Sequence, residues 1–237
     1  MIRVENFAKR FGTVAAARTV SFAADDGAVT ALIGANGSGK TTTLRAVAGL
    51  LKADGGRIAI DGIDVGAARL RAARRLGFMP DGAGLYPELT AREHVALFAR
   101  LHGLAGAKLR RATDAAIETL GLGAIANRRT RGFSSGERMR VALARAIVHA
   151  PQNVILDEPA RGLDVFGIRL LRDLVRALKA RGACVLLSSH VLSDVEVLAD
   201  AAVILDRGEV RAAGAPGALM RRYGADTLED AFVKATA

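Results

Sequence analysis

Residues 34–41 read Gly-Ala-Asn-Gly-Ser-Gly-Lys-Thr and match the pattern G-x-x-x-x-G-K-[ST]. Glycines at this spacing let the backbone curl until successive N–H groups face one anion. In such a loop the Lys40 ammonium reaches the outer phosphates of a nucleotide, and the Thr41 hydroxyl is a Mg²⁺ ligand. The pattern therefore predicts a phosphate-binding loop formed by Gly34, Ala35, Asn36, Gly37, Ser38, Gly39, Lys40, Thr41 and Thr42.

The segments on either side of this loop support the prediction. Residues 29–33 are an apolar run typical of a buried strand, and residues 41–51 place Leu44, Val47 and Leu51 on one face of a helix. Strand, loop and helix in this order are the context in which such a loop binds phosphate at the positive end of the helix. The alternative is a glycine-rich turn that binds nothing, and the flanking elements disfavour it.

Two later strand ends carry side chains suited to phosphate chemistry. Asp157 and Glu158 follow the apolar run 154–156, and His190 follows the run 186–189. Strand ends at the carboxyl edge of a parallel sheet face the ligand crevice. We expect Asp157 to serve Mg²⁺, Glu158 to orient and deprotonate an attacking water, and His190 to contact the γ-phosphate. Two solvated carboxylates and a structural histidine are the alternatives, which the upstream loop disfavours.

The elements that must position these residues follow from the hydrophobic pattern. Apolar runs alternate with helical segments along the second half of the chain, which predicts a largely parallel sheet covered by helices. Shorter strand-like runs near the N-terminus predict a smaller antiparallel layer. The runs assigned to the sheet are 154–156, 184–187 and 202–205, and those assigned to the layer are 2–4, 20–22 and 57–60.

Residues 82–150 differ from the rest because they hold much Ala, Leu and Arg at helical spacing and few β-branched runs. We interpret them as a helical subdomain inserted into the α/β core. The predicted fold class is thus α/β, a P-loop NTPase (RecA-like) core with an N-terminal antiparallel β layer and an inserted α-helical subdomain. Residues 1–223 are assigned to this domain and residues 224–237 to a short helical tail.

Composition excludes several classes of protein. A hydrophobic content of 51% in 237 residues excludes disorder, and no apolar run approaches a membrane span. The first residues lack the apolar core of a signal peptide, so we expect a cytoplasmic protein. The single Cys184 lies in an apolar run, which excludes a disulfide framework and favours a buried, inert thiol.

The net charge of +10 comes from 34 basic and 24 acidic residues. Such a balance suits a nucleic-acid partner or an anionic membrane surface. Basic residues are spread over the whole chain, and only 4% of residues are aromatic, without a basic and aromatic stripe. We therefore favour a compositional origin of the charge and expect no nucleic-acid partner.

The order of these motifs resembles the nucleotide-binding subunits of ABC transporters over essentially the whole chain. The phosphate loop is followed by Ser134-Ser135-Gly136-Glu137 opening a helix, by Asp157-Glu158, by Gly162-Leu163-Asp164 and by His190. The family's signature is usually Leu-Ser-Gly-Gly-Gln, and here a serine replaces the first glycine. The resemblance implies an ATPase that uses ATP and Mg²⁺, attached to the inner face of the membrane through a separate transmembrane subunit.

The resemblance also implies that one chain cannot complete the reaction. In the family the signature contacts the ATP of a facing cassette, arranged head to tail, so Ser134, Ser135, Gly136 and Glu137 are expected to bind a partner's nucleotide. The partner is an identical chain or a paired cassette. Asp164 resembles a residue of the interface loop, and an ordinary helix N-cap is the other role open to it.

Two positions carry open alternatives. Phe11 resembles the aromatic residue that stacks on adenine in the family, and a core phenylalanine is the alternative. Asp81 stands where the family usually has glutamine. The resemblance gives Asp81 a role as a Mg²⁺ or water contact, or a weakened coupling to the membrane partner.

The segments 81–94, 149–154 and 228–232 resemble the sodium-extruding exporter branch of the family, so export, including sodium efflux, is the expected direction. A soluble ABC protein acting on ribosomes or another nucleic-acid machine is the second hypothesis, but such proteins usually carry two cassettes. A catalytically dead cassette is the third, and intact Lys40, Asp157, Glu158 and His190 argue against it. The cargo does not follow from these residues.

Overall fold

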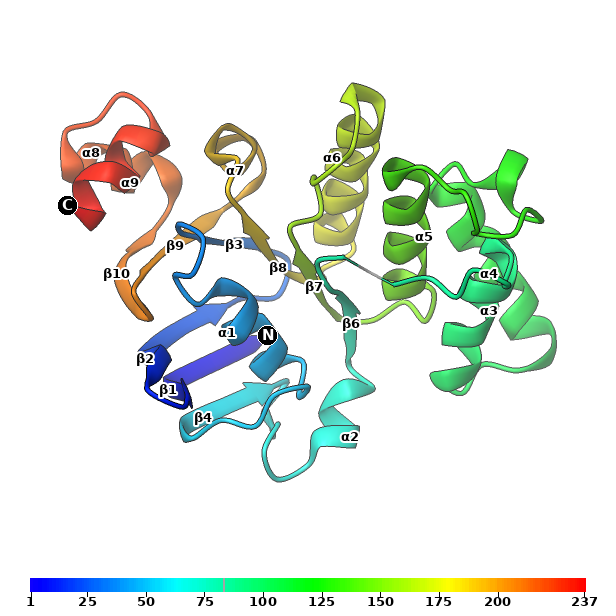
Figure 1. The fold of residues 1–237 in the computed structure, drawn as a ribbon, viewed down its shortest axis with the longest axis horizontal. Helices are drawn as coiled ribbons and strands as arrows, with labels where there is room; N and C mark the ends of the chain where they lie inside the picture. The colour runs from blue at the N-terminus through cyan, green and yellow to red at the C-terminus, as the bar shows by residue number, and fades with distance from the viewer. Residues whose placement is uncertain (83) are drawn as a thin grey trace.

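The computed structural model describes residues 1–82 and 84–237. In these residues ten strands form one curled sheet (Figure 1). The strands are β1 Ile2–Phe11, β2 Val14–Ala24, β3 Val29–Ile33, β4 Gly55–Ile60, β5 Ile63–Asp64, β6 Leu76–Met79, β7 Asn153–Asp157, β8 Cys184–Ser189, β9 Ala201–Asp206 and β10 Glu209–Gly214. Their order across the sheet is β5-β4-β1-β2-β10-β9-β3-β8-β7-β6.

The central strands are parallel and carry the core. β3 pairs in parallel with β8 and β9, and β7 pairs in parallel with β6 and β8. Every residue of β3 is buried, since helices and the N-terminal layer cover both faces. Val29, Ala31 and Ile33 contribute to one hydrophobic cluster and Leu32 to the other, so alternate side chains serve opposite faces.

The N-terminal layer is antiparallel, as the sequence predicts. β1 pairs with β2 on one side and with β4 on the other, and β5 extends the edge beyond β4. This layer joins the parallel part through one pairing of Thr19 on β2 with Glu209 on β10. The predicted fold class is confirmed.

Some helices cover the sheet. Three others, α3, α4 and α5, lie side by side as a group at one end of the molecule (Figure 1). Together with a 3₁₀ turn at Gly123–Ile125, the helices are α1 Lys40–Val47, α2 Arg69–Ala73, α3 Ala91–Leu101, α4 Gly106–Thr119, α5 Ser135–Ile147, α6 Val165–Ala180, α7 Leu192–Leu198, α8 Pro216–Tyr223 and α9 Leu228–Thr236. No helix of residues 1–82 and 84–237 has the length and hydropathy needed to cross a bilayer.

The C-terminal helix α9 packs against α7 and α8, and its Leu228 and Ala231 side chains are fully buried. The tail at 224–237 is therefore helical and packed on the rest of the chain. The division at residue 223 and the limits 82–150 of the inserted part stay predictions, and residue 83 within them lies outside the described residues.

Some predicted boundaries are wrong. The helix expected over 41–51 ends at Val47, because Gly49 takes a left-handed conformation with φ of 71° and terminates the turn. The connection before α8 is short, since Gly214 ends β10 and Pro216 begins α8. Proline suits a first helical position because its missing N–H has no partner there.

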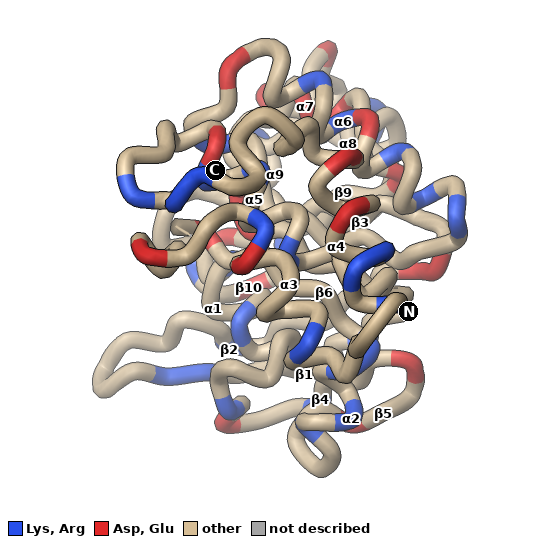
Figure 2. The backbone as a smooth tube through the Cα atoms, turned by 90° about the vertical axis from the view of Figure 1, so that its right-hand side faces the viewer, with Lys and Arg blue, Asp and Glu red and all other residues tan. Residues whose placement is uncertain are grey.

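Basic residues do not gather in one stripe in the view of Figure 2, where blue and red segments alternate over strands, helices and loops. The absence of a nucleic-acid partner stays a prediction. Cys184 is fully buried on β8, and burial raises the pKa of its thiol to about 11. Its side chain is therefore a neutral part of the core.

Candidate functional site

The phosphate loop joins β3 to α1 and depends on two glycines. Gly39 has φ of 107°, and a Cβ on it would lie 2.5 Å from the Ala16 carbonyl oxygen. A Cβ on Gly34 would lie 2.4 Å from the Leu205 carbonyl oxygen. The loop is thus pressed against β2 and β9, and only glycine fits at these points.

The N-terminus of α1 faces the loop without a side-chain cap. Gly39 occupies the N-cap position, no side chain accepts a hydrogen bond from the first turn, and that turn holds no acidic residue. The first N–H groups of a helix lack partners within the helix and carry its positive end. This end of α1 is therefore suited to an anion such as phosphate.

Lys40 lies almost buried in the first turn of α1. Its ammonium donates to the carbonyl oxygen of Gly34 at 2.6 Å and to that of Ala35 at 3.3 Å. Burial lowers the pKa of Lys40, and the nearby Glu158 and Asp157 carboxylates oppose this shift. Burial thus disfavours the charged form of Lys40, while the two carboxylates and the two carbonyl oxygens favour the ammonium and hold it across the loop.

Asp157 ends β7 and is fully buried. Its Oδ1 accepts from the Ser188 hydroxyl at 2.6 Å and from the Thr41 hydroxyl at 3.3 Å. Its Oδ2 has no hydrogen-bond partner among the described residues. A buried carboxylate oxygen without a partner is costly, and a cation is a natural ligand for it.

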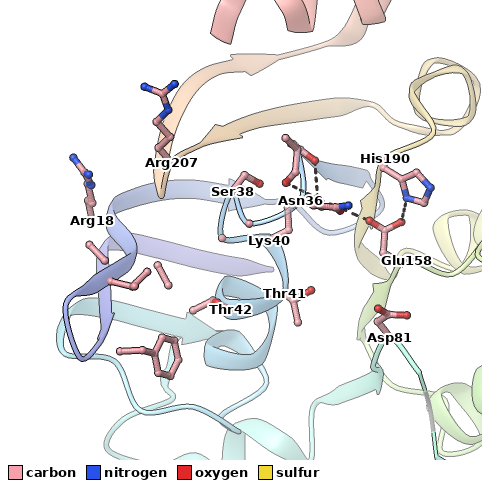
Figure 3. A pocket seen from close by; sticks show the side chains of 18 of the residues that line it. Arg18, Asn36, Ser38, Lys40, Thr41, Thr42, Asp81, Glu158, His190 and Arg207 are labelled. Carbon is pink, nitrogen blue, oxygen red and sulfur yellow. Dashed lines mark hydrogen bonds and ion pairs between the residues drawn. The ribbon is translucent and has the colours of Figure 1, made fainter.

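Glu158 lies between a lysine and a histidine (Figure 3). Its Oε2 is 2.6 Å from the His190 Nδ1, and its Oε1 is 3.9 Å from the Lys40 Nζ. The backbone of Glu158 is left-handed with φ of 51°, and its N–H donates to the Ser188 hydroxyl at 2.9 Å. An uncommon conformation held by a specific hydrogen bond fixes the direction of this carboxylate.

Lys40, Glu158 and His190 line one cavity of about 920 Å³. Phe11 lines the same cavity and is 51% exposed, so the alternative of a core phenylalanine is wrong. Asp81 lines it as well, on the side of Glu158 and His190 (Figure 3), and its carboxylate accepts from the Arg161 Nη1 at 2.9 Å. The structure thus brings together Phe11, residues 34–42, Asp81, Glu158 and His190, with Asp157 beneath them.

The signature residues lie outside this cavity. They line a second cavity of about 590 Å³ together with Gly162, Asp164 and Phe166. The Ser134 hydroxyl accepts from the Glu137 N–H, and the Glu137 carboxylate accepts from the Ser134 N–H. This reciprocal pair is a capping box at the start of α5. Asp164 caps α6 by accepting from the Gly167 N–H at 2.7 Å, which confirms its N-cap role.

Comparison with known proteins agrees with this arrangement. Residues 17–161 match the family model described as ABC transporter. The ABC transporter ATP-binding protein NatA of Bacillus subtilis (strain 168) is 34% identical over 98% of this chain and 97% of its own length. The chain belongs to the ABC transporter family. It is an ATP-binding cassette with ATPase activity.

Further similar proteins include the Nod factor export ATP-binding protein I of Burkholderia orbicola (strain AU 1054), 34% identical over 96% of the cassette and 75% of that relative. A solved ATP binding subunit of an ABC transporter covers 100% of both chains with 31% identity and a TM-score of 0.93. The ATP-binding cassette MJ0796, dimeric in a post-hydrolysis state with ADP and Pi, has 25% identity and a TM-score of 0.81, covering 91% of this chain and 98% of its own.

The site of this cassette contains residues that sequence reasoning missed. Ser188 anchors both Asp157 and Glu158 from the neighbouring strand end, a position that its place before His190 already signals. Arg161 follows Glu158 by three residues but has no pattern of its own. Arg18 and Arg207 also line the cavity, and finding them requires the pairing of β2 with the β9–β10 turn.

That turn also supports the phosphate loop. The Gly208 N–H donates to the Ser38 carbonyl oxygen at 3.0 Å, and the Gly208 carbonyl oxygen accepts from the Arg18 N–H at 2.8 Å. One residue thereby links the loop to the N-terminal layer. The position of the phosphate loop in the cassette thus depends on three parts of the chain that are distant in sequence.

Proposed function

We propose that this cassette hydrolyses ATP in the cavity formed by the phosphate loop, with Glu158 as the general base. The observation that carries the proposal is the position of the Glu158 carboxylate between His190 and Lys40 at the mouth of that loop. Backbone N–H groups of the loop and Lys40 hold the phosphates. Glu158 accepts a proton from water attacking the γ-phosphorus, and the bond to the β-phosphate oxygen breaks.

The other residues of the cavity orient this reaction. His190 donates to the γ-phosphate from one ring nitrogen while its Nδ1 faces Glu158, so it reports on the presence of that phosphate. The exposed ring of Phe11 stacks on the adenine.

Mg²⁺ fits the residues present. The buried Asp157 Oδ2 has no partner among the described residues, and the Thr41 hydroxyl lies beside the same carboxylate. No group of three His, Cys, Asp or Glu side chains that suits a metal occurs in the described part of the chain. Thr41 and Asp157 would hold the ion with phosphate oxygens, and the ion would neutralise phosphate charge. Asp81 stays a predicted further ligand, which would first have to leave Arg161.

Two cassettes would act together. The signature residues lie in a cavity separate from the phosphate loop, so they are free to approach a nucleotide on another chain. The similar cassette MJ0796 is dimeric with ADP and Pi. We expect Ser134, Ser135, Gly136 and Glu137 to complete the pocket of a partner, with Asp164 at the interface.

The proposed role is to power export through a separate transmembrane subunit at the inner face of the membrane. A similar protein is named for Nod factor export, which supports the direction. Sodium as the cargo rests on the likeness to NatA and to the sodium-extruding branch. A gene for a transmembrane partner beside that for the cassette, and transport in vesicles containing both, test this part.

The central test is the Glu158→Gln variant, which keeps the shape of the side chain and removes the base. We expect turnover to fall by about 10²–10⁴-fold while ATP binding persists, because general bases contribute this much. Size-exclusion chromatography with ATP should show a dimer of the variant. Unchanged turnover would remove Glu158 from the mechanism, and a variant that stays monomeric with ATP bound would contradict the two-cassette arrangement.

A further inference from the structure

We propose that Arg161 is a positioning residue for Asp81, and that nucleotide in the cavity weakens the ion pair between them. The inference rests on the proposed function and adds to it a partner for the residue at which this chain departs from its family. The Arg161 Nη1 donates to the Asp81 Oδ2 at 2.9 Å, joining two loops that are 80 residues apart.

The sheet brings the two residues together. Asp81 follows β6 by two residues and Arg161 follows β7 by four, and β6 pairs in parallel with β7 through Met79 and Leu156. Both loops therefore leave the same edge of the sheet, at the carboxyl ends of the strands. The ion pair of Asp81 and Arg161 connects these two loops.

Arg161 is tied to the general base. Its N–H donates to the Glu158 carbonyl oxygen at 3.1 Å, so Glu158 and Arg161 begin and end one tight turn. Through its side chain Arg161 then holds Asp81 against the turn that carries the base. A change in the partner of Asp81 therefore changes the restraint on the turn that carries Glu158, the proposed base.

The pair also stands between two cavities. Asp81 and Arg161 both line the nucleotide cavity, and both line a neighbouring groove of about 510 Å³ with Leu85, Ser135 and Met139. The groove thus reaches from the Asp81 loop to the signature helix α5. The ion pair is the part of the wall that the two spaces share.

The exposure of the pair fits a contact that exchanges. The Arg161 side chain is 65% exposed and that of Asp81 31%, and ion pairs in such surroundings contribute little to stability. A nucleoside triphosphate brings several negative charges into the cavity lined by Arg161, and these compete with one carboxylate for the guanidinium. A structural clamp would be buried, whereas this pair opens at small cost.

The test is a double-mutant cycle with Arg161→Gln, Asp81→Asn and the combined variant. Hydrogen exchange of peptides containing Asp81 is measured without nucleotide, and affinity is measured with a fluorescent ATP analogue, with Mg²⁺ and with EDTA. We expect each single variant to speed exchange by about three- to tenfold, and the double variant to match the singles. ATP should produce the same acceleration in the wild type.

Steady-state kinetics separate positioning from binding. Because bound ATP draws the Arg161 guanidinium from Asp81 to phosphate, Arg161→Gln should raise KM by about three- to tenfold with a smaller change in kcat, and Arg161→Lys should recover part of that lost affinity. The exchanged pair Asp81→Arg with Arg161→Asp should restore slow exchange. The control variants Arg176→Gln and Asp173→Asn remove another exposed Arg–Asp ion pair, on α6, and should change none of these quantities.

The proposal would be overturned if the two substitutions had multiplicative effects on the exchange rate of the Asp81 peptides. It would also be overturned if that rate were the same in all variants. Protection of the Asp81 peptides that increases in the wild type with ATP and is lost in Arg161→Gln would overturn the competition step. The exchange measured without nucleotide is independent of ATP turnover, so an inactive wild type would refute the proposed function and leave this arm of the test intact.

Discussion

The N-terminus of α1, after the phosphate loop, and the N-terminus of α5, at the signature, are satisfied in opposite ways. At α1 the N-cap is Gly39, with no side-chain cap and no acidic residue in the first turn. At α5 Ser134 and Glu137 form a complete capping box, and Glu137 also lies 3.5 Å from Arg128. The first end is left open to an external anion, and the second is already satisfied within the chain.

The glycines at these two helix ends also differ, in how closely the rest of the chain packs around them. A Cβ on Gly39 would lie 2.5 Å from a backbone oxygen, whereas the nearest atoms to a Cβ on Gly136 lie 3.9 Å away. The fold of the chain itself therefore demands Gly39 and makes no demand at Gly136. This contrast supports the proposal that the phosphate loop binds the chain's own nucleotide. At the signature it shows only that the space beside Gly136 is left free for a second chain.

The largest expected effect is that of Gly39→Ala. The new Cβ must displace the backbone of Ala16 and hold a left-handed φ of 107°, which we expect to cost about 2–4 kcal/mol of unfolding free energy. Nucleotide binding should be lost with it, because the loop N–H groups no longer face one centre. Urea unfolding and titration with a fluorescent ATP analogue measure the two effects.

The matched substitution is Gly136→Ala. It should leave the unfolding free energy unchanged or raise it by about 0.5–1 kcal/mol, since alanine favours a helix over glycine. ATP-driven dimerisation, measured in the Glu158→Gln background, should fall by tenfold or more if a partner's nucleotide packs on this position. Equal destabilisation by the two substitutions would break the contrast between the two helix ends.

Ser134→Ala tests the capping box against the proposed role in a partner's pocket. Thr90 and Glu93 form the same kind of box at the start of α3, so Thr90→Ala is a control with matched chemistry. Each substitution should lower stability by about 1 kcal/mol. Only Ser134→Ala should also reduce ATP turnover, by about tenfold, and equal turnover in the two variants would leave Ser134 with a structural role alone.

The sequence predicts most strands of this fold and the residues of the candidate site that the structure gathers around the phosphate loop. The β3 run and the runs before Asp157 and His190 are continuous and apolar, so their limits differ from the structure by only a few residues. The short strand β6 was missed, because Gly77 interrupts its apolar pattern. A Cβ there would lie 2.0 Å from the Ala146 carbonyl oxygen, a contact with α5 that only the fold creates.

Contacts between distant segments limit the prediction of the site. The spacing of residues 34–41 and 157–158 specifies local chemistry, but the pairing of Arg161 with Asp81 depends on the register of β6 against β7. The exposure of Phe11 depends on where β1 ends, which the short predicted run at 2–4 leaves open. Sequence patterns thus describe strand ends well and side-chain partners across the sheet poorly.

The C-terminal end of α5 offers a pH test of how the signature helix is attached. His149, two residues beyond α5, stacks on His102 after α3 with ring centroids 3.4 Å apart. Burial, aided by His102 and Arg181, lowers the pKa of His149 to about 4, and the Leu76 carbonyl opposes this. His149 therefore binds a proton more tightly in the unfolded chain, where its pKa has the ordinary value of about 6.5, than in the folded protein.

Stability should consequently fall as the pH decreases from about 6.5 towards 4. The shift, discounted for partial exposure, corresponds to about 1–2 kcal/mol at pH 5. Unfolding by urea at pH 7 and pH 5 measures it, and His149→Gln should show a smaller pH dependence than the wild type. A His149→Gln protein with the wild-type pH dependence would assign the effect to other groups.

The smallest expected effect concerns Phe11, at the end of the phosphate-loop cavity where we propose that adenine binds. Phe11→Leu keeps an apolar side chain and removes the ring face, so ATP affinity should fall by about three- to tenfold, in keeping with ~1 kcal/mol for aromatic stacking. Affinity for inorganic triphosphate, which has no base, should not change. Loss of affinity for both ligands would mean that Phe11 supports the phosphate loop through β1 and β2. Adenine would then have to stack on another side chain of this cavity.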